Sequence, residues 1–110
     1  MDYRELSTPA LIVDLDVLER NLDGMASYCR EHELGLRPHT KTHKTPEVAR
    51  MQMDHGAVGL TVAKVGEAEV MVDAGLDEVL VAYPIFGAEK ADRLARLARD
   101  RRILLSLDDY

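Results

Sequence analysis

The sequence predicts an α/β fold in which parallel strands alternate with crossover helices, as in the N-terminal half of a (β/α)8 TIM-type barrel. Short apolar runs recur every 20 to 24 residues, and the segments between them carry apolar side chains at helical spacing. The ends of these runs are Lys41, Ala63, Tyr83 and Leu107. Apolar strands that alternate with amphipathic helices are typical of a parallel sheet covered by helices. Four such units make half of a barrel of roughly 250 residues, so we expect an N-terminal part of a longer protein.

Residues 1–33 are predicted to form an N-terminal strand and a helix that lead into the barrel. The apolar run over 10–15 is bounded by turn-forming residues and predicts the strand. Asp16 and Glu19 form a capping-box pattern at the start of the helix. Apolar side chains then follow at helical spacing, at Leu18, Leu22, Met25 and Cys29.

Residues 34–110 are predicted to form the first four β/α units of an incomplete barrel. Leu34 and Leu36 alternate with Gly35 and Arg37, which indicates a first strand that ends near Lys41. The later elements are, in chain order, a helix that begins at Thr45 and Pro46 and ends before Gly56, a strand over 57–63, a helix over 65–74, a strand over 78–83, a helix over 88–99 and a strand over 102–107.

The composition favours small-molecule partners. With 14 basic and 20 acidic side chains the net charge is −6, which disfavours nucleic acids and offers no basic stripe to a membrane surface. Cys29 is the single cysteine, so no disulfide framework can form within the chain. The chain has no long apolar run that would span a membrane or act as a signal peptide. We therefore expect a cytoplasmic protein.

The stretch from Arg37 to Pro46 is the candidate functional site. Strand alternation places Arg37, His39 and Lys41 on one face, while the opposite face suits packing against helices. Lys41 would then lie at the carboxyl end of a parallel strand, where α/β folds collect their active sites. A lysine amine in that place can form a Schiff base with a carbonyl group. The alternative is an exposed basic turn without catalytic function.

The strings Arg-Pro-His-Thr-Lys-Thr-His-Lys-Thr at 37–45 and Ser-Thr-Pro-Ala-Leu-Ile-Val-Asp at 7–14 resemble the N-terminal part of the D-threonine aldolase and D-serine dehydratase family. The resemblance covers essentially the whole chain. It implies an alanine-racemase-like pyridoxal-phosphate barrel of fold type III, accompanied by a β-domain. It also implies a lyase acting on a β-hydroxy D-amino acid, in which Lys41 carries the cofactor as an internal aldimine. Lys44 is the competing lysine, at the opposite strand parity.

The resemblance implies further partners that lie outside this chain. Family enzymes use a divalent metal, Zn or Mn, whose ligands stand near the C-terminus, so we expect no metal ligands within these residues. His39 and His43 have a spacing that suits a metal on a helix, but their segment is predicted as strand and turn. We also expect a homodimer for the full-length protein and an inactive fragment for the 110-residue chain alone.

Three further side chains are candidates for contact with the cofactor. His39 shares a face with Lys41, and its alternative is a hydrogen-bonded histidine at a strand end. Arg37 could contact the cofactor ring, with a structural salt bridge as its alternative. Tyr83 ends a strand near the same rim, where the alternative is a packed aromatic side chain.

Three other functions remain open from the sequence. The first is an amino-acid racemase of the same fold, although the racemase motif Val-Lys-Ala-Asn-Ala-Tyr-Gly has a tyrosine where this chain has Thr45. The second is a pyridoxal-phosphate-binding protein without catalysis. The third is an inactive truncation that associates through its open sheet edges.

Overall fold

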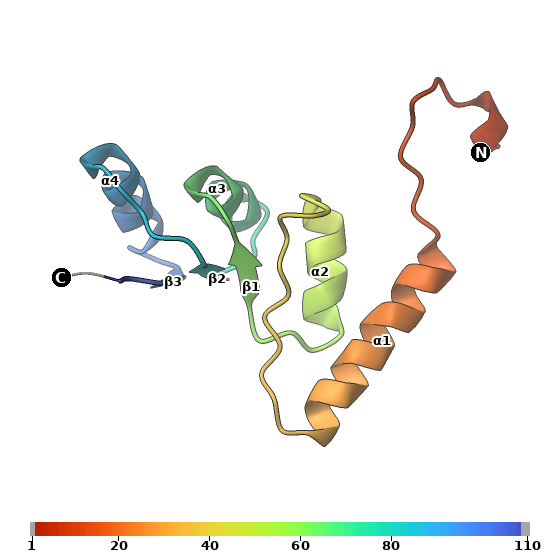
Figure 1. Ribbon diagram of the computed structural model, residues 1–110, viewed down its shortest axis with the longest axis horizontal. Helices are drawn as coiled ribbons and strands as arrows, with labels where there is room; N and C mark the ends of the chain where they lie inside the picture. Colours follow the sequence, from red (N-terminus) through yellow and green to blue (C-terminus); the bar gives the residue numbers. More distant parts are fainter. Residues whose placement is uncertain (1, 109–110) are drawn as a thin grey trace.

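The computed structural model describes residues 2–108, and within them a parallel sheet is flanked by helices on one side (Figure 1). The strands are β1 (Leu60–Val62), β2 (Glu78–Val81) and β3 (Arg102–Leu105), hydrogen-bonded in the order β1-β2-β3. In the register of this sheet, Leu60 lies opposite Val79, which lies opposite Ile103. The parallel α/β arrangement predicted from the repeating apolar runs is confirmed.

From α2 onward, helices and strands alternate along the chain. The helices are η1 (Tyr3–Glu5), α1 (Leu15–Glu31), α2 (Pro46–Asp54), α3 (Val65–Asp73) and α4 (Ala88–Leu97). Helices α2, α3 and α4 lie side by side along one side of the sheet (Figure 1). The core between the two layers consists mainly of Ala49, Leu60, Val62, Ala68, Met71, Val79, Val81 and Leu94. These apolar side chains fix the helix layer on the sheet, because their burial is the main favourable term in folding.

The first strand predicted, over 34–41, is an extended segment rather than a regular strand. It runs parallel to β1, and only His39 pairs with a strand residue, Thr61. The backbone N–H of Thr61 donates to the carbonyl of Pro38 at 2.8 Å, and that of Thr40 donates back to the carbonyl of Thr61 at 2.8 Å. Pro38 has no N–H to donate, and the chain turns directly after Thr40. The prediction was therefore wrong in the length of the strand and right in its place beside β1.

The strand predicted over 10–15 does not form within the described residues. The backbone is extended but unpaired, and Leu11, with 95% of its surface exposed, lies far from any core. This segment projects away from the sheet beyond the N-terminal end of α1 (Figure 1). A strand needs a neighbour to accept its backbone hydrogen bonds, and residues 2–108 place none beside it.

The helix that follows begins earlier than its capping pattern predicts. The N-cap is Asp14, whose carboxylate accepts the backbone N–H of Val17 at 3.1 Å. Asp16 instead lies in the first turn, where a negative charge favours the helix dipole. The predicted capping box was therefore wrong by two residues, because Asp14 performs the capping.

The remaining helix predictions are confirmed to within two residues. Thr45 is the N-cap of α2 with Pro46 in the first turn, although the Thr45 hydroxyl donates to the carbonyl of His43 instead of capping the helix. The strands are shorter than predicted at their ends. No helix in residues 2–108 is long and apolar enough to cross a membrane.

Candidate active site at the carboxyl edge of the sheet

A turn over residues 40–45 presents Lys41 near the carboxyl end of β1. Thr40 anchors this turn, because its side chain is completely buried and its hydroxyl donates to the carbonyl of Thr61 at 3.3 Å. The backbone N–H of Lys44 donates to the carbonyl of Thr40 at 2.8 Å and closes the turn. The Lys41 side chain is exposed, and its amine forms no hydrogen bond or ion pair with residues 2–108. The turn therefore holds an unpaired amine at this edge of the sheet.

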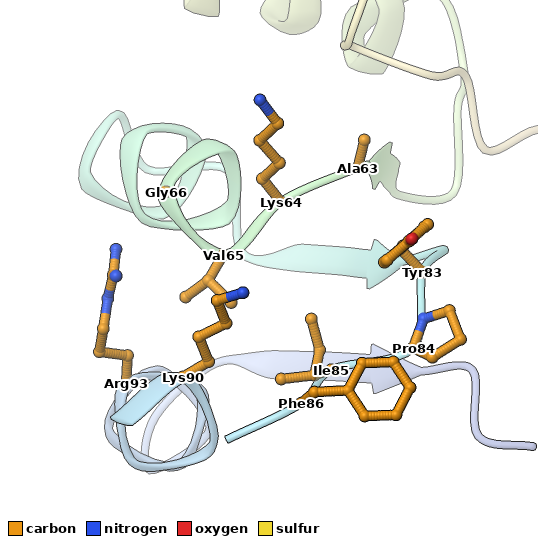
Figure 2. A pocket seen from close by; sticks show the side chains of 10 residues that line it. All are labelled: Ala63, Lys64, Val65, Gly66, Tyr83, Pro84, Ile85, Phe86, Lys90 and Arg93. Atoms are coloured by element: carbon orange, nitrogen blue, oxygen red, sulfur yellow. The ribbon is translucent and has the colours of Figure 1, made fainter. Parts of the chain in front are cut away.

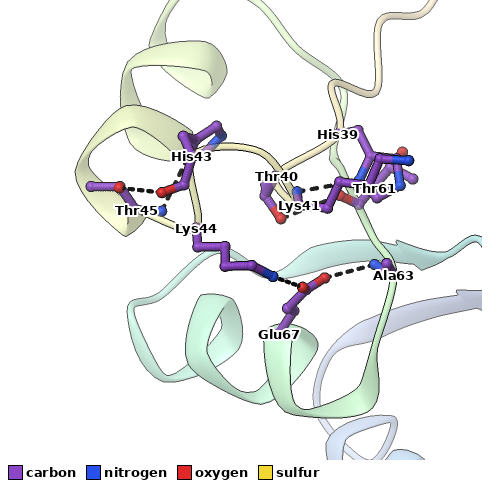
Figure 3. A network of polar contacts seen from close by, with 9 residues as sticks. All are labelled: His39, Thr40, Lys41, His43, Lys44, Thr45, Thr61, Ala63 and Glu67. Atoms are coloured by element: carbon purple, nitrogen blue, oxygen red, sulfur yellow. Dashed lines mark hydrogen bonds and ion pairs between the residues drawn. The ribbon is translucent and has the colours of Figure 1, made fainter. Parts of the chain in front are cut away.

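The second lysine of the turn, Lys44, is held by Glu67 at the start of α3 (Figure 3). One carboxylate oxygen of Glu67 pairs with the Lys44 amine, and the other accepts the backbone N–H of Ala63 at 2.8 Å. Burial opposes ionisation of Glu67, but the hydrogen bonds from Lys44 and Ala63 prevail and lower its pKa. Glu67 is thus a carboxylate at neutral pH that ties the turn to the end of β1.

The side chain of His39 lies beside the backbone of Lys41. The side chain is half-buried, and its Nδ1 accepts the backbone N–H of Lys41 at 3.3 Å. Burial lowers the pKa of His39, and the nearby charges of Lys41 and Lys44 lower it further. His39 is therefore a neutral imidazole at physiological pH, and its contact with a cofactor stays a prediction.

Arg37 lies at the opposite, amino end of the sheet. Its guanidinium pairs with the carboxylate of Glu78, the first residue of β2. The same carboxylate also forms an ion pair with Arg102 at 3.4 Å. The Arg37 side chain passes so close to Gly59 that a Cβ added there would lie 2.1 Å from its Nη1. The structure does not bring Arg37 to Lys41, and this geometry favours the structural salt bridge that was its alternative.

Tyr83 stands at the carboxyl end of β2 and lines a hollow of about 570 Å³ between the starts of α3 and α4. Figure 2 shows Tyr83 and Pro84 at one end of this hollow, with Lys90 and Arg93 at the other. Lys41 is not among the lining residues. Tyr83 is 61% exposed and does not pack as a core aromatic. Its contact with a cofactor remains a prediction.

Within residues 2–108, no three His, Cys, Asp or Glu side chains come together as a metal site. His39 and His43 each use Nδ1 to accept a backbone N–H, from Lys41 and Thr45 respectively. Both histidines therefore stabilise the backbone of the turn over 40–45 through these hydrogen bonds.

Sequence reasoning missed Glu67. A local signal was present, because Glu67 stands in the first turn of α3, where an acidic side chain favours the helix dipole. What the sequence could not show is that this carboxylate also reaches back to Lys44, 23 residues earlier.

Residues 13–109 match the family model described as the alanine racemase N-terminal domain. The chain is 43% identical over 100 residues to a 3-hydroxy-D-aspartate aldolase of Paracoccus denitrificans, which covers 90% of this chain and 26% of the relative. It is 42% identical over 77 residues to a D-threo-3-hydroxyaspartate dehydratase of Delftia sp., which covers 70% of this chain and 20% of the relative.

The fold matches that of a solved relative as well. The crystal structure of a D-threonine aldolase from Filomicrobium marinum superposes with a TM-score of 0.95 at 48% identity, covering 97% of this chain and 29% of that one. This agreement confirms the predicted N-terminal part of an alanine-racemase-like barrel. The chain spans between a fifth and three tenths of the length of these relatives.

Proposed function

The chain belongs to the alanine racemase N-terminal domain family, and from this premise we propose that it is the lysine-bearing part of a pyridoxal-phosphate-dependent lyase. Its substrate would be a β-hydroxy D-amino acid, and Lys41 would attach the cofactor. The observation that carries this proposal is the contrast between two lysines of one turn. The amine of Lys41 is exposed and unpaired within the described residues, whereas that of Lys44 is paired with Glu67.

The residues present suit the attachment of pyridoxal phosphate. Attachment needs an amine that is accessible to an aldehyde and is not held by a carboxylate, and Lys41 meets both conditions. Its place at the carboxyl edge of a parallel sheet is where barrel enzymes bind their ligands.

When bound, pyridoxal phosphate supplies an electron sink that allows a bond at the substrate Cα to break heterolytically. Lys41 would hold the cofactor at this edge of the sheet. Its amine would then be placed to move a proton at Cα. His39 would keep the main chain of Lys41 in place through the hydrogen bond that it accepts, and its neutral ring adds no positive charge beside the amine.

The substrate class follows from the relatives. A 3-hydroxy-D-aspartate aldolase, a D-threonine aldolase and a D-threo-3-hydroxyaspartate dehydratase are all named for amino acids that carry a β-hydroxy group. Aldol cleavage and dehydration differ in the group that acts on the β-oxygen. We propose that this group, with a divalent metal, stands outside these residues, and that the full-length protein is a cytoplasmic homodimer.

The attachment is tested by borohydride reduction of the longest natural product that carries this sequence, after incubation with pyridoxal phosphate and before peptide mapping by mass spectrometry. We expect a phosphopyridoxyl adduct on Lys41. An adduct confined to Lys64 or Lys90, or no adduct, would contradict the proposal.

Product analysis then separates the reactions. Incubation with D-threonine or D-3-hydroxyaspartate should give glycine and an aldehyde if the enzyme is an aldolase, or ammonia and a 2-keto acid if it is a dehydratase. Appearance of only the epimer that is inverted at Cα would favour the racemase alternative. An adduct on Lys41 without turnover of any D-amino acid would favour a cofactor-binding protein.

A further inference from the structure

We propose that Glu67 is a positioning residue that biases which of two neighbouring lysines is available to an aldehyde. It holds Lys44 in an ion pair and leaves Lys41 open. For the aldehyde of pyridoxal phosphate the inference rests on the proposed function. For the reactivity of the two amines it stands on the geometry alone.

The turn offers two lysines that are three residues apart, and both are accessible to small molecules. Lys41 is exposed, and 57% of the Lys44 side chain is exposed as well. Accessibility therefore does not separate them. The ion pair does, because the Lys44 amine must first leave the Glu67 carboxylate before it can attack a carbonyl carbon, whereas the Lys41 amine has no partner to leave within residues 2–108.

Glu67 is well suited to hold one lysine firmly. Only 11% of its side chain is exposed, so the carboxylate is shielded from water on most sides. The backbone N–H of Ala63 binds the second oxygen and fixes the orientation of the carboxylate (Figure 3). An ion pair with one partly buried and preorganised partner is stronger than a pair between two mobile surface side chains.

The simpler explanation is that Glu67 only ties the start of α3 to the end of β1. Its bond to the N–H of Ala63 lies between these two elements, and that bond needs an acceptor but no charge. Glu67→Gln separates the two roles, since the amide oxygen can still accept the N–H while the negative charge is lost. Glu69→Gln is the matched control, because Glu69 lies on the same helix and pairs with Arg93 instead of a lysine.

The first experiment needs no cofactor. The amines of the full-length protein are labelled with a limiting amount of acetic anhydride, and the labelling rates of Lys41, Lys44 and the exposed Lys90 are compared by mass spectrometry. We expect Glu67→Gln to raise the rate of Lys44 relative to Lys90 by about two- to fivefold, the range for one exposed ion pair. Glu69→Gln should leave this ratio unchanged. An equal ratio in the wild type and Glu67→Gln would overturn the inference.

The same labelling measurement can be made without a substitution, so the test does not depend on whether a variant folds. In the unmodified protein, raising the salt concentration from low to about 1 M screens the ion pair. The rate of Lys44 should then rise relative to that of Lys41. A constant ratio would contradict the role of Glu67 without any substitution.

The second experiment extends the inference to pyridoxal phosphate. Borohydride trapping is repeated on Lys41→Ala and on the double variant Lys41→Ala with Glu67→Gln. We expect about two- to fivefold more adduct on Lys44 in the double variant. Equal adduct in both would overturn the inference for the cofactor. Absence of an adduct on Lys41 in the wild type would instead refute the proposed function and leave the labelling result standing.

Discussion

The two ends of the sheet treat their charged side chains differently. At the amino end, the carboxylate of Glu78 lies between Arg37 and Arg102 and pairs with both, so each of these cations has a carboxylate partner. At the carboxyl end, Glu67 neutralises Lys44, while Lys41 stays without a partner in the described residues. One end is closed by its ion pairs, and the other keeps an amine available.

This difference follows a division known from barrel enzymes, in which one end of the strands serves stability and the other serves chemistry. Ion pairs at the amino end tie the segment of Arg37 to β2 and β3. An unpaired amine at the carboxyl end contributes nothing to the packing and is free to react. Substitutions at the carboxyl end should therefore change activity, and substitutions at the amino end should change stability.

The largest effect is expected from Lys41→Ala. The activity proposed for the full-length protein should fall on the order of a thousandfold or more, because the proposed attachment of the cofactor and the proposed proton-transferring amine would be lost together. Stability should change by less than about 0.5 kcal/mol, since the side chain is exposed and unpaired. Steady-state kinetics and chemical unfolding measure the two effects. A large loss of stability would show that Lys41 is structural.

Gly59→Ala is the converse at the amino end. The added Cβ would lie 2.1 Å from Nη1 of Arg37 and 3.0 Å from the carbonyl oxygen of Glu78, so Arg37 must leave its place and its ion pair. We expect the free energy of unfolding to fall by about 1–3 kcal/mol, as for other overpacked sites.

The control for this substitution is Gly24→Ala, because an added Cβ at Gly24 meets no atom within 4 Å. In Gly59→Ala protein that remains folded, the borohydride adduct on Lys41 should be unchanged. Loss of the adduct would mean that the two ends of the sheet are coupled and do not act separately.

The sequence predicted the helices well because their signals are local. Pro46 at the start of α2, and Gly75 with a φ of +82° after α3, mark helix ends through backbone properties that need no tertiary contact. The run over 10–15 has equally clear apolar residues but no strand beside it, and pairing is not a local property. Local patterns thus predict helices more safely than strands.

The site shows the same limit. Alternation placed Arg37 and Lys41 on one face, yet four residues of extended chain separate the two ends of a short sheet, so a shared face did not mean a shared site. The position of Lys41 was predictable because strand ends can be located from the repeat. The pairing of Lys44 with Glu67 was not, because it joins residues from two different β/α units.

A smaller effect is expected in the turn itself, where Lys44 has a φ of +51°. This left-handed conformation strains any residue with a Cβ, and glycine relieves the strain. Lys44→Gly and Lys44→Ala both remove the pair with Glu67, so their difference isolates the backbone. We expect the glycine variant to be more stable by about 0.5–1 kcal/mol, after allowing for the greater flexibility of unfolded glycine. Equal stability in chemical unfolding would show that the turn relaxes.

The smallest expected effect is on the pH dependence of stability, which should differ between the two ends of the sheet. At the carboxyl end, burial lowers the pKa of His43 below its ordinary value of 6.5, although contacts with Gln52 and Thr45 oppose this. The unfolded chain then binds a proton more readily than the folded one, so stability declines as the pH falls below about 6.5. At the amino end, the hydrogen bond from Arg37 lowers the pKa of Glu78 below 4.5. Ionised Glu78 therefore contributes to stability above pH 4.5, and this contribution is lost only as the pH falls through the lowered pKa of Glu78.

Thermal unfolding between about pH 7.5 and 5.5 should accordingly report on His43 and not on Glu78. We expect the melting temperature of the wild type to decrease over this interval, and the decrease to be smaller in His43→Gln, which has no proton to gain. Glu78→Gln should lower the melting temperature by a similar amount at both pH values, because Glu78 is ionised throughout this interval. If His43→Gln follows the wild-type curve, another group at the carboxyl end must take up the proton, and His39, whose pKa is lowered in the same direction, is the next to replace.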